Sequence, residues 1–293
     1  MNNYSRAFAL IITLANLPGT AFAGGWVRPE GESYVKLAAG VFRTAGYWEL
    51  DGALVDTPAL EYTNRSASLY AELGVAPGVA FGFYLPFVQA QNTDVFEISY
   101  ARSSLGDLDS FVQVQLLTEG RFALATQVLL RVPLYQGVLT GVNTQTGWVS
   151  ESLPAFSEFF PAIGDGSVDV VPSLQLGVGL SPVPGWLTLE AGPRLRNRGF
   201  GATLNYSVGV GVYLWPNWLA LTSRVGGWER LSKTSESPTS RLVSFGAGLA
   251  LQLGLGLALE VEGYYVPEGS FVARGGGASV GLSYRGPAFP GND

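Results

Sequence analysis

The sequence predicts an all-β fold, a transmembrane antiparallel β-barrel of about 12 strands, and three observations lead to it. Apolar residues alternate with polar or small residues at a period of two, the period of a strand with two different faces. The alternating segments run to about ten residues, the length that a tilted strand needs to cross a bilayer. Only 14% of the chain is charged and 12% is aromatic, whereas a soluble domain is roughly 25% charged.

Residues 66–89 show the alternation most clearly. Leu69 and Leu73 belong to an apolar face, and the opposite face is polar or small. A tight turn at Pro77-Gly78 precedes a second arm, which carries Phe83 on its apolar face. This pattern predicts a β-hairpin with two arms long enough to span a membrane.

The rest of the chain repeats this unit. No apolar run after the N-terminus is as long as the 18 or more residues of a spanning helix, so a membrane crossing must use strands closed into a barrel. Single-chain bacterial outer-membrane barrels have an even number of strands. The expected strands are residues 33–42, 66–75, 79–89, 111–117, 122–134, 168–180, 186–196, 202–215, 218–228, 242–253, 257–265 and 273–284.

Long connections alternate with short turns between these strands. The long ones are residues 43–65, 90–109 and 135–166. Outer-membrane barrels keep short turns on the periplasmic side and long loops outside, so both termini are expected in the periplasm. Aromatic residues near strand ends predict an interfacial girdle: Trp186, Trp215, Trp218, Trp228, Tyr265 and Tyr284.

The N-terminus has the order of a secretory signal peptide. Arg6 precedes an apolar run over residues 7–17, and Ala21 and Ala23 are the small residues expected before a cleavage site. We interpret residues 1–23 as a signal peptide that is removed, with a buried strand or short helix as the alternative. The remaining residues 24–293 show no linker and are expected to form a single outer-membrane β-barrel domain of a Gram-negative-type bacterium.

Composition argues against several functions. The chain has no His and no Cys, so Ser/His and Cys/His catalytic arrangements are excluded and a zinc site would need carboxylates alone. Glu260 and Glu262 could form a carboxylate pair, or they could be lumen charges matched by arginines. We expect no enzyme and no catalytic, cofactor-binding or metal-binding residues. A net charge of −6 without a basic patch argues against nucleic acid as a partner.

The polar face of the strands predicts a lumen with charges of both signs. Isolated buried charge is costly, so these residues are expected to pair across strands and to leave a narrow, weakly ion-selective lumen. The lumen-facing candidates are Lys36, Glu72, Gln127, Arg131, Asp169, Glu190, Arg194, Arg196, Arg224, Glu260 and Glu262.

The connection over residues 135–166 is unusually apolar for a loop. Its aromatic residues could pack on the barrel mouth, line an entry for an apolar solute or bind a neighbouring protein. We interpret it as a lid over the outer mouth, with Trp148, Phe156, Phe159 and Phe160 as the lid candidates.

Several phrases in the first 110 or so residues resemble a known family. They are Gly25-Trp26 with Gly31, residues 34–37, 68–75 and 82–87, and Leu105-Gly106-Asp107-Leu108. They are similar to outer-membrane barrels described as transporter-like proteins of the phenol-degradation MetA-pathway type, with XagA-like relatives. The resemblance implies an outer-membrane barrel with a transport role.

Two functions remain open from the sequence. The first is passage or uptake of a small solute across the outer membrane, with an apolar or aromatic solute suggested by the resemblance. The alternative is a structural or surface-interaction barrel with a plugged lumen that acts through its extracellular loops. The expected partners are outer-membrane lipid and lipopolysaccharide, and the small apolar solute; protein partners are left open.

Replacing Phe156, Phe159 and Phe160 together by Ser should raise the open-pore conductance and weaken uptake of an apolar solute, because the change removes the lid's apolar surface. Planar-bilayer recordings and a liposome uptake assay measure the two effects. If a variant that still folds shows neither effect, the lid interpretation is wrong.

Overall fold

The structure is a computed structural model. It describes residues 24–48, 54–55, 61–93, 98–135, 138–143, 149–151, 161, 163–164, 166–197, 200–215, 218–232, 241–270 and 272–287. The signal peptide expected over residues 1–23 lies outside this part of the chain, so it stays a prediction.

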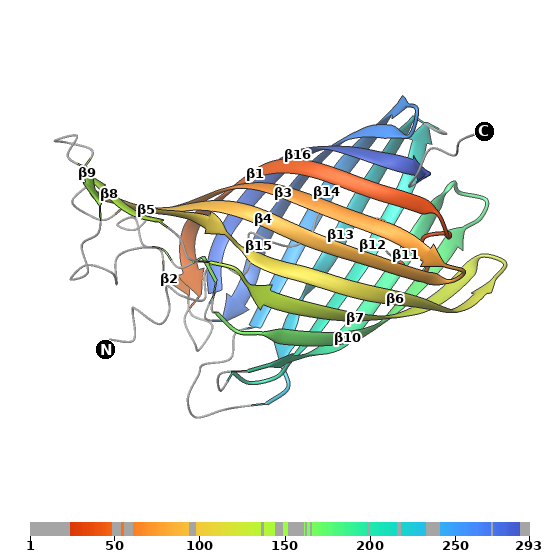
Figure 1. Ribbon diagram of the computed structural model, residues 1–293, viewed down its shortest axis with the longest axis horizontal. Helices are drawn as coiled ribbons and strands as arrows, with labels where there is room; N and C mark the ends of the chain where they lie inside the picture. Colours follow the sequence, from red (N-terminus) through yellow and green to blue (C-terminus); the bar gives the residue numbers. More distant parts are fainter. Residues whose placement is uncertain are drawn as a thin grey trace.

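The chain forms a closed antiparallel barrel of 12 strands, which confirms the predicted fold class (Figure 1). The barrel is closed because its first strand pairs with its last, from Glu32 opposite Pro287 to Trp48 opposite Val272. In order around the barrel, the strands are β1 (Glu32–Trp48), β3 (Glu61–Ala76), β4 (Val79–Thr93), β6 (Asp107–Glu119), β7 (Phe122–Pro133), β10 (Asp169–Leu180), β11 (Gly185–Arg196), β12 (Thr203–Trp215), β13 (Leu219–Arg230), β14 (Arg241–Gly254), β15 (Leu257–Ser270) and β16 (Val272–Pro287).

Four further strands lie at one end of the barrel. β2 (Leu54–Val55) pairs with the end of β1, and β5 (Ile98–Leu105) continues the line of β6 along β4. β8 (Val138–Asn143) pairs with β5 and β9 (Val149–Glu151) pairs with β8, and these strands extend beyond the barrel (Figure 1).

The expectation of long loops over residues 43–65 and 90–109 was therefore wrong in part. β1 continues to Trp48, β3 begins at Glu61, and β5 occupies much of the second segment. Ladder hydrogen bonds do not depend on hydrophobicity, so pairing continues past the apolar band into polar sequence. The end of an alternating apolar pattern marks the end of the hydrophobic band and not the end of the strand.

The two rims of the barrel differ. At the short-turn rim, strands are joined by tight turns such as Pro77-Gly78, where Gly78 has φ 72°, a left-handed value that favours glycine. At the opposite long-connection rim, β7 and β10 are joined through residues 134–168. Both the start of β1 and the end of β16 lie at the short-turn rim, since Glu32 is opposite Pro287.

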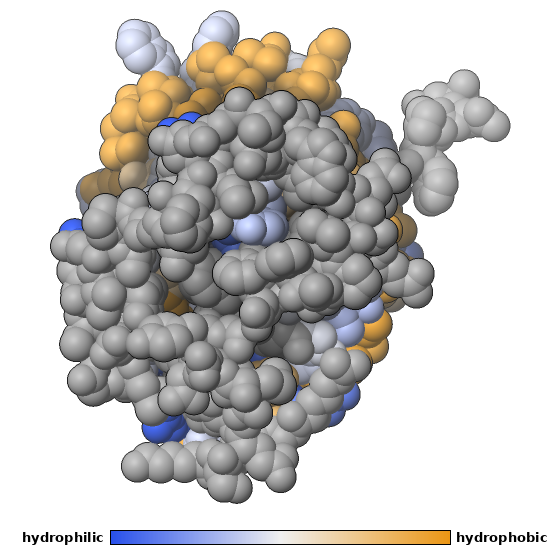
Figure 2. Space-filling view, turned by 90° about the vertical axis from the view of Figure 1, so that its left-hand side faces the viewer, coloured by the Kyte–Doolittle hydropathy of each residue, from blue (hydrophilic) through white to orange (hydrophobic). Residues whose placement is uncertain are grey.

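Large apolar side chains form the outer wall of the barrel. Leu37 on β1 is 60% exposed, and Phe87, Val128, Leu174 and Leu249 are similarly placed on other strands. Figure 2 shows hydrophobic residues along the outer edge of the wall as seen from the long-connection end. Such a band exposed to water would be costly, so it is the lipid-facing surface of the fold. No helix among the described residues is long and apolar enough to cross a membrane.

The aromatic girdle is only partly as expected. Trp215 and Trp218 are exposed at the short-turn rim, and Tyr265 is exposed on the outer wall. Trp186 lines the barrel interior and Trp228 is buried in it, so the expectation was wrong for these two. A position near a strand end does not decide which face a side chain takes, because the face follows from the parity of the residue along the strand.

Replacing Leu37 by Arg should lower the free energy of unfolding by about 2–4 kcal/mol if residue 37 lies near the bilayer midplane, because the charge must enter hydrocarbon. Denaturant unfolding of the barrel refolded in lipid vesicles measures this. Leu255→Arg, at the tip of a short turn where Leu255 is 94% exposed, is the matched control and should cost at most about 1 kcal/mol. Equal costs at both positions would contradict the assignment of a lipid-facing band.

Candidate functional site

The barrel interior contains a cavity of about 330 Å³. It is lined by inward side chains from strands all around the barrel, including Lys36 and Phe42 of β1 and Arg224 of β13. A central cavity with both charged and aromatic walls is the candidate site.

The structure brings the predicted lumen residues to the interior in two groups. The first group lines the cavity: Lys36, Gln127, Arg131, Glu190, Arg194, Arg224 and Glu262. The second group lies in contacts beside it: Glu72, Asp169, Arg196 and Glu260. The alternation along each strand puts all of these residues on the inner face of the barrel. The register between strands decides which of them form ion pairs with each other.

A row of alternating charges crosses four adjacent strands near the long-connection rim. Register places Asp109 of β6 opposite Arg131 of β7, Arg131 opposite Asp169 of β10, and Asp169 opposite Arg196 of β11. Arg131 makes two hydrogen bonds to Asp109, from Nε to Oδ1 at 2.6 Å and from Nη2 to Oδ2 at 2.7 Å. This bidentate geometry is the strong form of the arginine–carboxylate pair.

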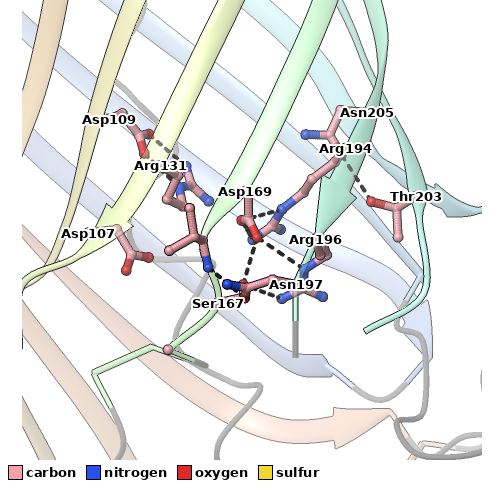
Figure 3. Close-up of polar contacts among 12 residues, drawn as sticks. Asp107, Asp109, Arg131, Ser167, Asp169, Arg194, Arg196, Asn197, Thr203 and Asn205 are labelled. Atoms are coloured by element: carbon pink, nitrogen blue, oxygen red, sulfur yellow. Dashed lines mark hydrogen bonds and ion pairs between the residues drawn. The ribbon is translucent and has the colours of Figure 1, made fainter. Parts of the chain in front are cut away.

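Asp169 is the centre of this row and is fully buried. Its Oδ2 accepts from Arg194 Nε at 2.7 Å and its Oδ1 accepts from Ser167 Oγ at 2.6 Å, while Arg196 Nε lies 3.5 Å from Oδ1 (Figure 3). One carboxylate thus serves two arginines, and the hydroxyl of Ser167 completes its hydrogen bonding.

Sequence reasoning missed Asp109. The residue was assigned to the end of a polar loop, yet it has the parity of Phe111 and Gln113, which face inward on the same strand. That shared parity could have extended the strand to include it.

A second cluster joins β1, β15 and β16. Lys36 Nζ lies 2.6 Å from Glu260 Oε2 and 3.0 Å from Glu262 Oε1. Glu260 Oε1 also accepts hydrogen bonds from Tyr34 at 2.8 Å and from Ser283 at 2.6 Å. Both glutamates are therefore held by a lysine on the strand that closes the barrel, which favours the lumen-charge alternative over a catalytic pair.

Aromatic rings cover another part of the inner wall. Tyr34 and Tyr70 make an edge contact with centroids 5.8 Å apart, and Tyr70 stacks on Phe111 at 6.0 Å. Tyr84 belongs to the same buried cluster. These rings come from β1, β3, β4 and β6 and give the cavity one aromatic side, which we call the aromatic wall.

The first part of the segment of residues 24–31, which precedes β1, lies inside the barrel. Gln115 of β6 accepts a hydrogen bond from Val27 N at 2.9 Å, and Arg28 Nη2 donates to Glu72 Oε2 at 3.2 Å. A Cβ at Gly177 would collide with the ring of Trp26, so this glycine makes room for the tryptophan. We call residues 24–31 the N-terminal segment.

A cluster of buried apolar side chains lies inside the barrel toward the long-connection rim. Ile163, from the connection between β7 and β10, is 1% exposed and belongs to a cluster with Phe42, Trp228 and Leu242. Part of that connection thus folds into the mouth of the barrel. The lid candidates Trp148, Phe156, Phe159 and Phe160 lie outside the described residues, so the lid stays a prediction.

Within the described part of the chain, no three acidic, histidine or cysteine side chains come together as metal ligands. The arrangement offers instead paired charges, an aromatic wall and a cavity, a set suited to binding a small molecule.

The comparisons with known proteins agree on the fold. No protein-family model matches the chain, and no curated protein matches it in sequence. Among solved structures, the COG4313 outer membrane channel from Pseudomonas putida F1 is similar with a TM-score of 0.67 and 12% identity, over 92% of this chain and 99% of that one.

Domains of two autotransporters are also similar. The translocator domain of the autotransporter NalP from Neisseria meningitidis gives a TM-score of 0.52 at 12% identity, over 88% of this chain and 90% of that one. The beta domain of the Bordetella autotransporter BrkA gives 0.50 at 14% identity, over 87% and 99%. The fold is therefore that of an outer-membrane β-barrel, and this fold supports an outer-membrane location.

Replacing Asp169 by Asn should lower the free energy of unfolding by about 3–5 kcal/mol, because Arg194 and Arg196 would remain buried without their carboxylate. The matched control is Glu268→Gln at the long-connection rim, where Glu268 pairs with Arg241 and both side chains are about half exposed. That change should stay within about 1 kcal/mol. Denaturant unfolding in lipid vesicles compares the two, and a small effect at Asp169 would show that the row is not structurally important.

Proposed function

We propose that this protein lets a small solute pass across the outer membrane through the barrel lumen. The single observation that carries the proposal is the central cavity, which has space for a small molecule and is lined by inward residues of many strands. The COG4313 protein from Pseudomonas putida F1, which is similar in fold, is an outer membrane channel, and this supports the proposal. We propose no enzymatic activity for the chain.

The aromatic wall favours a solute with an apolar or aromatic part. Tyr70, Tyr84 and Phe111 line the cavity, so a bound molecule would meet aromatic side chains there. The charges of the row over β6, β7, β10 and β11 are held in ion pairs, so they give the cavity a polar wall beside the aromatic one.

Passage requires the N-terminal segment to move or to leave a path beside it. Its polar contacts to the wall include the hydrogen bonds of Gln113 and Gln115 and the ion pair of Arg28 with Glu72, and movement would have to break some of them. The same segment favours the second candidate function, a plugged barrel that acts through its extracellular loops. The Ile163 cluster toward the long-connection rim favours that alternative too.

The proposed orientation places the short-turn rim, and with it both ends of the mature chain, in the periplasm. It follows that export uses the signal peptide over residues 1–23, and that the N-terminal segment enters the lumen from the periplasmic side. Outer-membrane lipid and lipopolysaccharide would then contact the outer wall.

Replacing Trp26 by Gly should raise the single-channel conductance, because the indole ring occupies lumen space against Gly177. Planar-bilayer recordings of the refolded protein measure it. The matched control is Trp218→Gly, because Trp218 is 64% exposed at the short-turn rim and should leave the conductance unchanged. Absence of conductance in both the natural protein and the Trp26 variant would favour the plugged barrel.

A further inference from the structure

Arg224 differs from other basic residues of the barrel interior. Arg28, Lys36, Arg131, Arg194 and Arg196 each have a carboxylate oxygen within 3.5 Å. Arg224 lines the same cavity, yet among the described residues it has no ion pair and no hydrogen-bonded side-chain partner. A guanidinium has five N–H donors, so those of Arg224 are left for water or for a solute.

The strands beside Arg224 leave its side chain uncovered. Register places Gly209 of β12 and Gly246 of β14 directly opposite it on either side. Neither neighbour has a side chain that could cover the guanidinium or compete for it. Nε of Arg224 lies 3.7 Å from the Cβ position of Gly226, two residues along its own strand, so the side chain lies along the wall of the cavity.

The rest of the cavity indicates what kind of molecule this arginine would hold. Phe42, Tyr70, Tyr84 and Phe111 line the cavity along with Arg224. A solute that used both features would have an apolar or aromatic body and one anionic group. An arginine binds a carboxylate through two parallel hydrogen bonds, which gives both charge and geometric recognition.

The acidic residues of the cavity limit the charge of that solute. Glu262 lies 3.0 Å from Lys36 Nζ, but it shares this single ammonium group with Glu260. Glu190 accepts a hydrogen bond from Ser173 Oγ at 3.1 Å, and no basic partner is seen for it in the described part of the chain. Only β12 lies between the strand of Glu190 and that of Arg224. A carboxylate without a basic partner so near to Arg224 disfavours a second negative charge on the solute.

We propose that Arg224 anchors the carboxylate of a monoanionic solute whose apolar body lies on the aromatic wall. This inference rests on the proposed function, because it names the class of solute that the lumen would take. A hydrocarbon without a charged group would leave Arg224 unused, and a dianion would meet Glu190.

The test uses 3-phenylpropionate and its neutral counterpart 3-phenylpropanamide, which share a ring and a chain. Isothermal titration of the refolded full chain should show tighter binding of the acid by about tenfold, the size expected for one hydrogen-bonded charge pair. Arg224→Gln should remove this preference while leaving amide binding unchanged. Arg224→Lys should keep part of it, because it retains the charge without the bidentate geometry.

Glu190→Gln is the matched control in the same cavity. It also replaces one charged side chain by a glutamine, but it should keep or increase the preference for the acid. Heat-modifiable mobility on gels checks that each variant has folded as a barrel. Equal binding of acid and amide by the natural protein, or an unchanged preference in Arg224→Gln, would overturn the proposal.

Bilayer conductance of the same samples separates this inference from the proposed function. A barrel that conducts ions but shows no preference for the acid would leave passage standing and overturn the anchor at Arg224. A barrel that binds the acid through Arg224 but never conducts would support the anchor and count against passage.

Discussion

Closure of the sheet by β1 and β16 is the constraint on which the rest of this structure depends. In hydrocarbon no water can satisfy an open strand edge, so each backbone group must find a partner within the protein. The ladder from Glu32 opposite Pro287 to Trp48 opposite Val272 meets that need. Once the barrel is closed, each residue must face either lipid or lumen, and a single change of parity would bring charges into lipid.

The interior is organised by the cost of buried charge. Asp109, Arg131, Asp169 and Arg196 lie in one row because each isolated charge would lose its hydration without replacement. Lys36 of β1 likewise forms ion pairs with Glu260 and Glu262 of β15. Arg224 differs from these residues, because among the described residues it has no ion pair. Glycines lie opposite it on both neighbouring strands.

Both ends of the lumen are narrowed by segments that are not barrel strands. The N-terminal segment is held by Gln115 and Glu72 near the short-turn rim, and Ile163 packs with Phe42 and Trp228 toward the other rim. A cavity narrowed at both ends would suit the proposed passage of a small solute better than the passage of larger ones. In the proposed function, the aromatic wall would act on a solute through its shape.

The sequence by itself determined the barrel, the number of its strands and the face on which Leu37 or Lys36 lies. The reason is that a period of two is a property of the single strand and does not depend on which strand it pairs with. The sequence could not determine strand ends, since polar residues after Phe42 still pair. Only the tertiary structure decided that Asp109 meets Arg131, that Trp228 faces inward and that Arg224 has no ion pair among the described residues. It also placed Trp26 against Gly177. Those contacts depend on register between strands distant in sequence and on where a segment without alternation folds, and no local pattern encodes either.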